Sequence, residues 1–177
     1  MARVFKLKSD QLIEDLVHGG VLGLVVAYMY VIEFQKRGLP HAHILLILDH
    51  DRLVTPVMVD SVVTAELPPS PNDTIDAAAR AQRQELENIV VSNMIHGPCG
   101  AANPNSPCME NGRCTKKFPK AFVKKTVVDP SNCYATYQRR STADGGRQVR
   151  HPKSGIMLDN SWVVPYWTIL SVFILTL

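Results

Sequence analysis

The chain has 177 residues, of which 46% are hydrophobic and 20% are charged, and its formal net charge is +3. This length is enough for one domain with a real core and excludes two large domains, while the composition excludes a disordered chain. The four cysteines are clustered in a chain too large for a small secreted disulfide scaffold, and no secretory signal opens the sequence, so we expect a nuclear or intracellular, reducing location.

The first part of the chain predicts a helix followed by two strands. Ser9 is placed to cap a helix over residues 10–18, which Gly19 and Gly20 would end. The uncharged run 21–32 is short for a membrane span and rich in Val, Ile and Tyr, which favours a buried strand continuing to Gln35. A turn at residues 37–40 then leads into a second strand that ends at Leu48.

This predicted hairpin gathers candidate metal ligands. Residues two apart on a strand point to the same face, so His41 and His43 project together, and Glu33 and Gln35 do so on the partner strand. Two imidazoles and one oxygen donor make a three-ligand site that leaves positions for water and phosphate oxygens. The alternative is that the histidines are ordinary core or edge residues. Hairpin register, which the sequence does not reveal, decides between Glu33 and Gln35 as the third ligand.

Beyond the hairpin the pattern predicts an extended segment and then a helix. Residues 57–67 are typical of a strand, and the prolines of 68–71 enforce a loop. A helix is predicted over residues 73–94. Its buried stripe would consist of Ile75, Ala79, Leu86, Ile89, Val90 and Met94. Strands followed by helices without internal repeats indicate an α+β fold, in which helices pack on one face of an antiparallel sheet.

The segment 96–120 is rich in turn residues and in soft metal ligands. It contains His96, Cys99, Cys108 and Cys114, and zinc sites use such residues in tetrahedral sets, often with a two-residue gap in the first pair. The later spacings are irregular for a zinc finger. Structural zinc and buried, unligated cysteines both remain open, and Cys133 is a spare thiol or an alternative ligand.

Positive charge concentrates between residues 113 and 153, where eleven Lys or Arg accompany only two acidic residues. Such a block favours a nucleic-acid backbone as partner, and aromatic residues interleaved with it suit the stacked bases of single-stranded DNA. A solvated basic face with ordinary aromatic packing is the alternative. The candidate DNA-binding residues are Lys116, Lys117, Lys120, Lys124, Lys125, Arg139 and Arg140.

Several motifs in order resemble the replication-initiator domain of Helitron rolling-circle transposons. The resemblance covers about residues 2–166 and rests on segments 33–43 (the His-hydrophobe-His motif), 93–100, 107–109, 114–120 and 159–166. It implies an antiparallel sheet whose central strand holds the paired histidines. It also implies metal-dependent nicking and joining of single-stranded DNA by a tyrosine, in a protein that carries a helicase as well.

The resemblance further implies a pair of catalytic tyrosines on a helix beyond Tyr166. Residues 167–177 contain no tyrosine, and no Gly-x4-Gly-Lys-Ser/Thr phosphate loop occurs anywhere in the sequence. We therefore expect a truncated or frame-shifted fragment with no catalytic residue of its own and little or no cleavage. The run from Trp162 onward is apolar and uncharged but falls short of a membrane span, so a membrane partner is not expected.

Together these features predict an α+β initiator-like domain with a Cys-rich loop segment. We expect a metal-site half at 1–95, a Cys/His-rich basic segment at 96–166 and a divergent apolar tail at 167–177. The expected ligands are Mg²⁺ or Mn²⁺ at the histidines, zinc at the Cys/His set and single-stranded DNA, with no small-molecule substrate. The alternatives are a zinc-ordered DNA-binding remnant without catalysis and a non-functional relic whose tail makes it insoluble.

Overall fold

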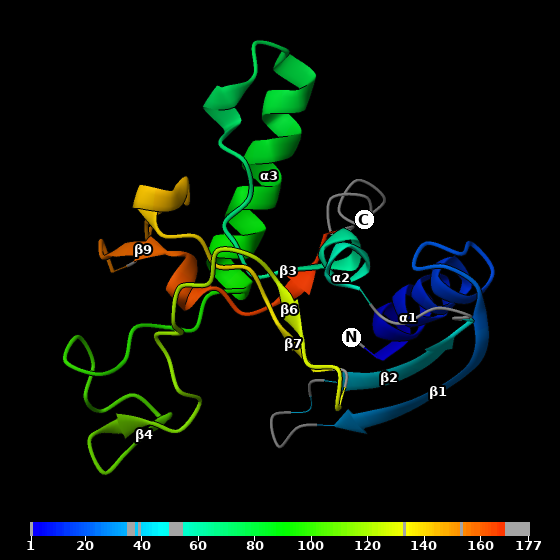
Figure 1. Ribbon diagram of the computed structural model, residues 1–177. Helices are drawn as coiled ribbons and strands as arrows, with labels where there is room; N and C mark the ends of the chain where they lie inside the picture. The colour runs from blue at the N-terminus through cyan, green and yellow to red at the C-terminus, as the bar shows by residue number, and fades with distance from the viewer. Residues whose placement is uncertain are drawn as a thin grey trace. The chain divides into compact units, whose positions relative to one another are not determined.

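The computed structural model of the protein describes residues 2–34, 38, 40–49, 55–132, 134–152 and 154–168 (Figure 1). Helices and small antiparallel sheets alternate along the chain, which confirms the predicted α+β class. The chain divides into two compact units, residues 1–53 and 54–177, and each is described by itself. No helix in the described ranges combines the length and the apolar character needed to cross a membrane.

The first unit consists of one helix and one hairpin: α1 (Ala2–Val17), β1 (Val25–Phe34) and β2 (Pro40–Leu48). The predicted start of α1 is wrong, because the helix begins well before Ser9. The Ser9 hydroxyl donates to the Phe5 carbonyl within the helix instead of capping it, and a Lys6–Asp10 ion pair of 2.8 Å supports this early turn. The predicted end is confirmed, with Gly20 in the left-handed region at φ 61°.

The predicted hairpin is confirmed, and its register decides which side chains share a face. β1 and β2 are antiparallel, with Glu33 opposite His41 and Val31 opposite His43. Along β2 the residues alternate, since His41 and His43 are exposed whereas Ala42 and Ile44 are half-buried. Within the described residues β2 pairs with β1 alone, so the histidines lie in a two-stranded sheet and not on the central strand of a larger one.

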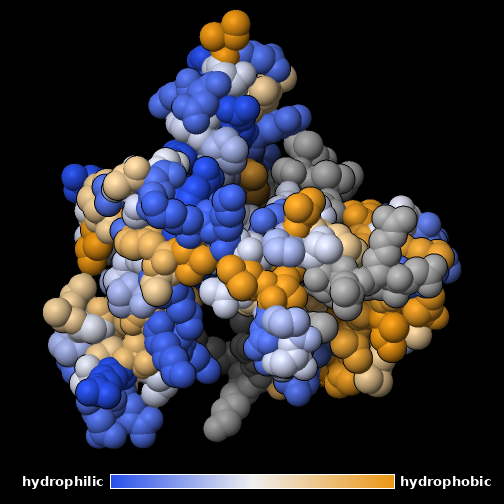
Figure 2. Space-filling model, in the orientation of Figure 1, coloured by the Kyte–Doolittle hydropathy of each residue, from blue (hydrophilic) through white to orange (hydrophobic). Residues whose placement is uncertain are grey.

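The prediction of a buried strand within residues 21–35 is wrong, because the hairpin leaves many apolar side chains in contact with solvent. Figure 2 shows apolar residues gathered over β1 and β2. The exposed members of this set are Val26, Tyr28, Met29, Tyr30, Val31, Ile32, Phe34, Leu45 and Ile47. A two-stranded sheet is marginal by itself in water, so the packing of α1 against both strands contributes to the order of this unit.

The second unit begins with α2 (Pro56–Val62), where the predicted strand over residues 57–67 is largely wrong. Thr55 caps this helix by accepting from the Met58 N–H, and Pro56 occupies the first helical position, where its missing N–H costs nothing. Only β3 (Val63–Thr64) is extended in the predicted way, and it pairs with β10 (Tyr166–Trp167). The capping signal therefore outweighed the β-branched composition of the segment.

The predicted long helix is present as α3 (Ala77–Asn93) and is shorter at its start. Asp76 caps it, while Asp73 belongs to the separate 3-10 turn η1 (Pro71–Asp73). Ile75 precedes the helix and is 99% exposed, so its predicted place in the buried stripe is wrong. Of the other stripe residues, Val90 belongs to a core cluster, and Leu86 and Met94 pack against it. The cluster consists of Leu67, Val90, Val91, Val163 and Tyr166.

The remaining elements of the second unit are short and joined by turns. They are β4 (Met109–Glu110), β5 (Arg113–Cys114), β6 (Val127–Val128), β7 (Ala135–Thr136), η2 (Thr142–Asp144), β8 (Gln148–Arg150), β9 (Met157–Asp159) and η3 (Asn160–Trp162). Their strands pair as the two-stranded sheets β4–β5, β6–β7 and β8–β9. With so little regular structure, this unit depends on side-chain hydrogen bonds for its order.

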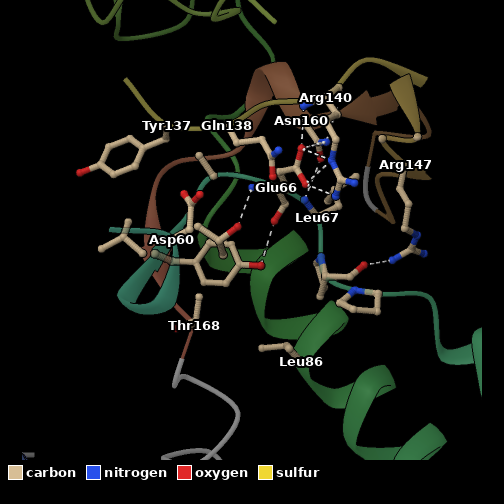
Figure 3. Close-up of a pocket in the computed structure, with 18 of the residues that line it drawn as sticks. Asp60, Glu66, Leu67, Leu86, Tyr137, Gln138, Arg140, Arg147, Asn160 and Thr168 are labelled. Atoms are coloured by element: carbon tan, nitrogen blue, oxygen red, sulfur yellow. Dashed lines mark hydrogen bonds and ion pairs between the residues drawn. The ribbon is translucent and has the colours of Figure 1, made fainter. Parts of the chain in front are cut away.

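A buried polar network centred on Glu66 supplies those hydrogen bonds (Figure 3). The Glu66 carboxylate accepts from the Arg140 guanidinium at 2.5 to 3.1 Å and from the Arg140 backbone N–H at 2.6 Å. Asn160 donates to Glu66 at 3.2 Å and accepts from the Leu67 N–H at 2.8 Å. The Tyr166 hydroxyl donates to the Glu66 carbonyl, and burial raises the pKa of this hydroxyl. The network thereby joins three distant segments of the chain.

Arg139 is a buried member of the same network. It is 6% exposed, and its Nη1 donates to the backbone carbonyls of Ala65, Asn160 and Val163 at 3.3, 2.9 and 2.5 Å. Burial lowers the pKa of Arg139, while the nearby Glu66 charge opposes that shift. Buried cations are tolerated only when they are paired and hydrogen-bonded, and these three carbonyls with the nearby carboxylate meet that condition.

Candidate metal centres and nucleic-acid interface

The paired histidines of β2 lie side by side on the exposed face of the hairpin. Their ring centroids are 4.9 Å apart with the planes at 67°, and the His43 Nε2 lies 3.4 Å from a Glu33 carboxylate oxygen. The three side chains therefore bring two imidazoles and a carboxylate to one patch of solvent-exposed surface. The His43 and Glu33 side chains are 63% and 65% exposed, so a phosphate oxygen has access from solvent.

The register also places the candidate third ligands. Glu33 lies directly opposite His41, on the same face as both histidines. Gln35, the alternative third ligand, lies outside the described residues. Among the described residues, one group of side chains has its ligand atoms close enough together to hold a metal ion. The hairpin trio is not that group.

That group consists of His96, Cys99, Cys108 and Cys114, the residues predicted to hold zinc. Their ligand atoms all lie within 4.8 Å of one another, and the Cys114 Sγ is 3.4 Å from the His96 Nε2. Tetrahedral zinc with bonds of about 2.3 Å to sulfur and 2.0 Å to nitrogen separates such ligands by roughly 3.5 to 3.8 Å. No pair of ligand atoms therefore has to close by more than roughly 1.3 Å on binding. One imidazole and three thiols are a donor set that zinc uses, so the residues fit this metal.

Local turns explain how an irregular spacing yields a compact set. Between Cys108 and Cys114, the strands β4 and β5 form a hairpin whose turn residues Asn111 and Gly112 have φ of 50° and 75°. An Asn-Gly pair with both φ positive makes the tight turn that matches strand twist, so it returns the chain within two residues. The Thr115 N–H and hydroxyl both donate to the Cys108 carbonyl, which holds the two ends of this hairpin together.

The end of α3 holds the other two ligands. Met94 is the C-cap of α3, and its carbonyl accepts from the Val164 N–H at 2.7 Å. The His96 N–H then donates to the Trp162 carbonyl at 2.9 Å. His96 is thus tied to the η3 segment, and Cys99, which is 3% exposed, follows it into the interior of the cluster.

The surroundings of the cluster lower the pKa of the His96 imidazole and of the Cys114 thiol and raise that of the Cys99 thiol. Burial, followed by the positive charges of Lys120 and Lys116, lowers the pKa of His96. Burial and the neighbouring thiols raise the pKa of Cys99 to about 12. Burial also acts upward on Cys114, but hydrogen bonds from the Phe118 and Lys116 backbones outweigh it and lower its pKa. A bound cation would supply the charge that keeps all three thiols deprotonated.

The basic residues named from the sequence fall into two groups. Lys116, Lys117 and Lys125 are exposed, and Lys124 is exposed while it pairs with Asp144 at 2.8 Å. Lys120 is half-buried, and its ammonium donates to the Lys116 carbonyl. Arg139 and Arg140 instead serve the Glu66 network, so their charges are used within the fold. The lysines of 116–125 are the part of the predicted set that faces solvent.

Glu66 and Asn160 are the residues whose importance the sequence analysis missed. Glu66 is a lone acid within the apolar run 63–67, and this isolation is a usable signal for a partnered buried carboxylate. Asn160 belongs to the motif 159–166, and the structure gives that motif a structural role. Its Asp159 carboxylate caps η3, while Asn160 and Tyr166 hold Glu66 and its neighbour Leu67.

Comparison with known proteins bears on the first unit. Residues 1–46 match the family model described as "Helitron helicase-like domain at N-terminus". The match includes α1, β1 and the part of β2 that carries both histidines. No curated protein matches the chain. The match supports the resemblance inferred from the motifs for this region: residues 1–46 are similar to a Helitron helicase-like N-terminal domain.

Proposed function

We propose that this chain is a DNA-binding and metal-binding part of a Helitron-type replication initiator. The observation that carries the proposal is the exposed trio of Glu33, His41 and His43, which lies within the matched residues 1–46. The exposed lysines of 116–125 add a basic surface suited to a DNA backbone. Intracellular action on single-stranded DNA, in the nucleus where the element is eukaryotic, follows from the same proposal.

At the hairpin, His41 and His43 would hold a divalent cation, Mg²⁺ or Mn²⁺, together with Glu33 or Gln35. The bound cation would supply a positive charge that polarises a scissile phosphate. The residues themselves would fix its position, because a paired strand holds both imidazoles at a set spacing, and the opposite strand holds the carboxylate. Their exposure leaves coordination positions open to a phosphate.

Metal selectivity tests this assignment. We expect the purified chain to bind Mn²⁺, and His41→Ala with His43→Ala to abolish that binding while zinc content stays unchanged. Conversely, Cys108→Ser should release zinc and leave Mn²⁺ binding intact, since the two ligand sets share no residue. Titration by Mn²⁺ electron paramagnetic resonance and zinc analysis of the same samples provide the measurement. Unaltered Mn²⁺ binding by the double histidine variant would refute a site at the hairpin.

DNA binding and cleavage are tested separately. We expect the 177-residue chain to bind a single-stranded oligonucleotide with an affinity that falls steeply as salt increases, because lysine contacts release counterions. We expect no covalent protein–DNA adduct with Mn²⁺, because the family's tyrosine pair follows the segment ending at Tyr166 and residues 167–177 contain no tyrosine. Fluorescence polarisation and denaturing gels supply the two readouts. A 5′-phosphotyrosine adduct would disprove the second expectation, and salt-independent affinity would disprove the first.

A zinc-ordered DNA-binding remnant without catalysis is the second candidate. The compactness of the Cys/His set favours it, because those four ligands already lie close together whereas the hairpin trio is open. Both candidate functions predict that the chain binds zinc and DNA, and only the first predicts that it binds Mn²⁺. A chain that binds zinc and DNA but no Mn²⁺ is this remnant.

A further inference from the structure

A cavity of about 610 Å³ lies beside the Cys/His set in the second unit. One wall is formed by His96, Phe118 and the two lysines Lys116 and Lys120. The rest of the lining is mostly apolar and consists of Ala121, Val123, Ala135, Thr136, Tyr137, Arg139, Val164 and Pro165. Its volume falls within the range of roughly 300 to 1,000 Å³ that is usual for small-ligand sites.

The charge of this cavity favours an anion. Lys116 and Lys120 line it, together with Arg139, whose charge is used within the fold, and its described lining includes no Asp or Glu. A second cavity of this unit, of about 500 Å³, differs in that Asp60, Glu66 and Asp73 line it and its arginines are paired with carboxylates. Of these two cavities, the one beside the Cys/His set therefore offers a ligand positive charge without a carboxylate in its lining.

Aromatic and apolar groups give the same cavity flat surfaces. The Phe118 ring stacks on the His96 ring with centroids 4.3 Å apart and planes at 9°, and the Lys120 ammonium lies 4.9 Å from the Phe118 centroid. Tyr137 and Pro165 line the cavity as well. A flat base with an attached phosphate matches apolar walls beside lysines, which is the combination that proteins use for single-stranded nucleic acid.

We propose that this cavity binds one nucleotide of single-stranded DNA, with the base against the apolar lining and the phosphate at Lys116 and Lys120. The proposal rests on the proposed function and adds the place where the strand is held. His96 links the cavity to the Cys/His set, because its ring faces Phe118 while its Nε2 faces the Cys114 sulfur. A cation held by His96 would therefore fix the position of the His96 ring, on which the Phe118 ring stacks.

The first test compares two double variants of equal charge in the full chain. Lys116→Ala with Lys120→Ala should weaken binding of a fluorescent oligothymidylate at least tenfold. Arg3→Ala with Lys8→Ala, which removes two exposed cations of α1 that belong neither to the cavity lining nor to the lysines of 116–125, should weaken it less than threefold. Zinc content and circular dichroism serve as folding controls. Equal losses in the two variants would overturn the proposal, and failure of the wild type to bind would overturn the proposed function itself.

The second test needs no substitution and so does not depend on the folding of a variant. An oligonucleotide carrying 5-iodouracil is photocrosslinked to the wild-type chain, and the attached peptide is mapped by mass spectrometry. Crosslinks to Phe118 or Tyr137 are expected, since both aromatic rings line the cavity. Crosslinks confined to residues outside the lining would overturn the proposal even if DNA binding is strong.

Discussion

Replacing Glu66 by alanine is expected to lower the free energy of unfolding of the second unit by about 3 kcal/mol or more. The substitution removes a carboxylate that accepts from Arg140 at both oxygens and from Asn160, and it leaves these donors without their partner in a largely buried site. Both tryptophans of the sequence, Trp162 and Trp167, lie in this unit, so urea unfolding followed by tryptophan fluorescence reports on it directly.

Glu85→Ala is the matched control for this prediction. Glu85 is an exposed residue of α3, and its loss should change the free energy of unfolding by no more than about 0.5 kcal/mol. If the free energy of unfolding of Glu66→Ala lies within about 1 kcal/mol of the wild-type value, the Glu66 network does not hold the second unit together. The segments of this unit must then be joined by the apolar cluster alone.

Removal of zinc is expected to have the second large effect. Segment 96–120 has two short strands and little apolar packing, so the metal would contribute much of the free energy that orders it. We expect a strong chelator to lower the Tm of the second unit by roughly 10 °C or more and to abolish protection from hydrogen exchange in residues 96–120. Differential scanning fluorimetry and exchange mass spectrometry measure these two effects.

Two serine variants sharpen the zinc prediction. Cys99→Ser should reproduce the effect of the chelator, because Cys99 is the most buried ligand of the set. Cys133, the remaining cysteine, lies outside the described residues, and Cys133→Ser should leave zinc content and Tm as in the wild type. Zinc loss from Cys133→Ser would instead identify Cys133 as a ligand, and an unchanged Tm after chelation would mean that the cysteines are buried without metal.

Much of the candidate site could be predicted because strand periodicity is a local property. The spacing of His41 and His43 predicts a shared face in any strand, and the turn residues before Pro40 predict the hairpin that brings Glu33 opposite. Residue type and the two-residue gap between His96 and Cys99 single out the four candidate ligands of the Cys/His set. Their compactness does not follow from the later spacings, because it depends on the Asn111-Gly112 turn that closes the loop.

What could not be predicted depends on contacts between distant segments or on competing local signals. Residues 57–62 have a β-rich composition, yet the Thr55 cap and Pro56 direct them into α2. Arg139 and Arg140 resemble any other pair in a basic block. Their role depends on Glu66, which lies more than seventy residues earlier in the chain. No local sequence pattern predicts contacts between segments so far apart.

The distance between these partners has a consequence for synthesis on the ribosome. Glu66 is translated long before Arg140, Asn160 and Tyr166, which supply its hydrogen-bond partners. The second unit therefore cannot complete its folding until nearly its whole length has emerged, and nascent chains must keep α3 and its apolar face unassembled meanwhile. A reading frame interrupted before codon 160 would thus yield a product that proteases clear and not a smaller working domain.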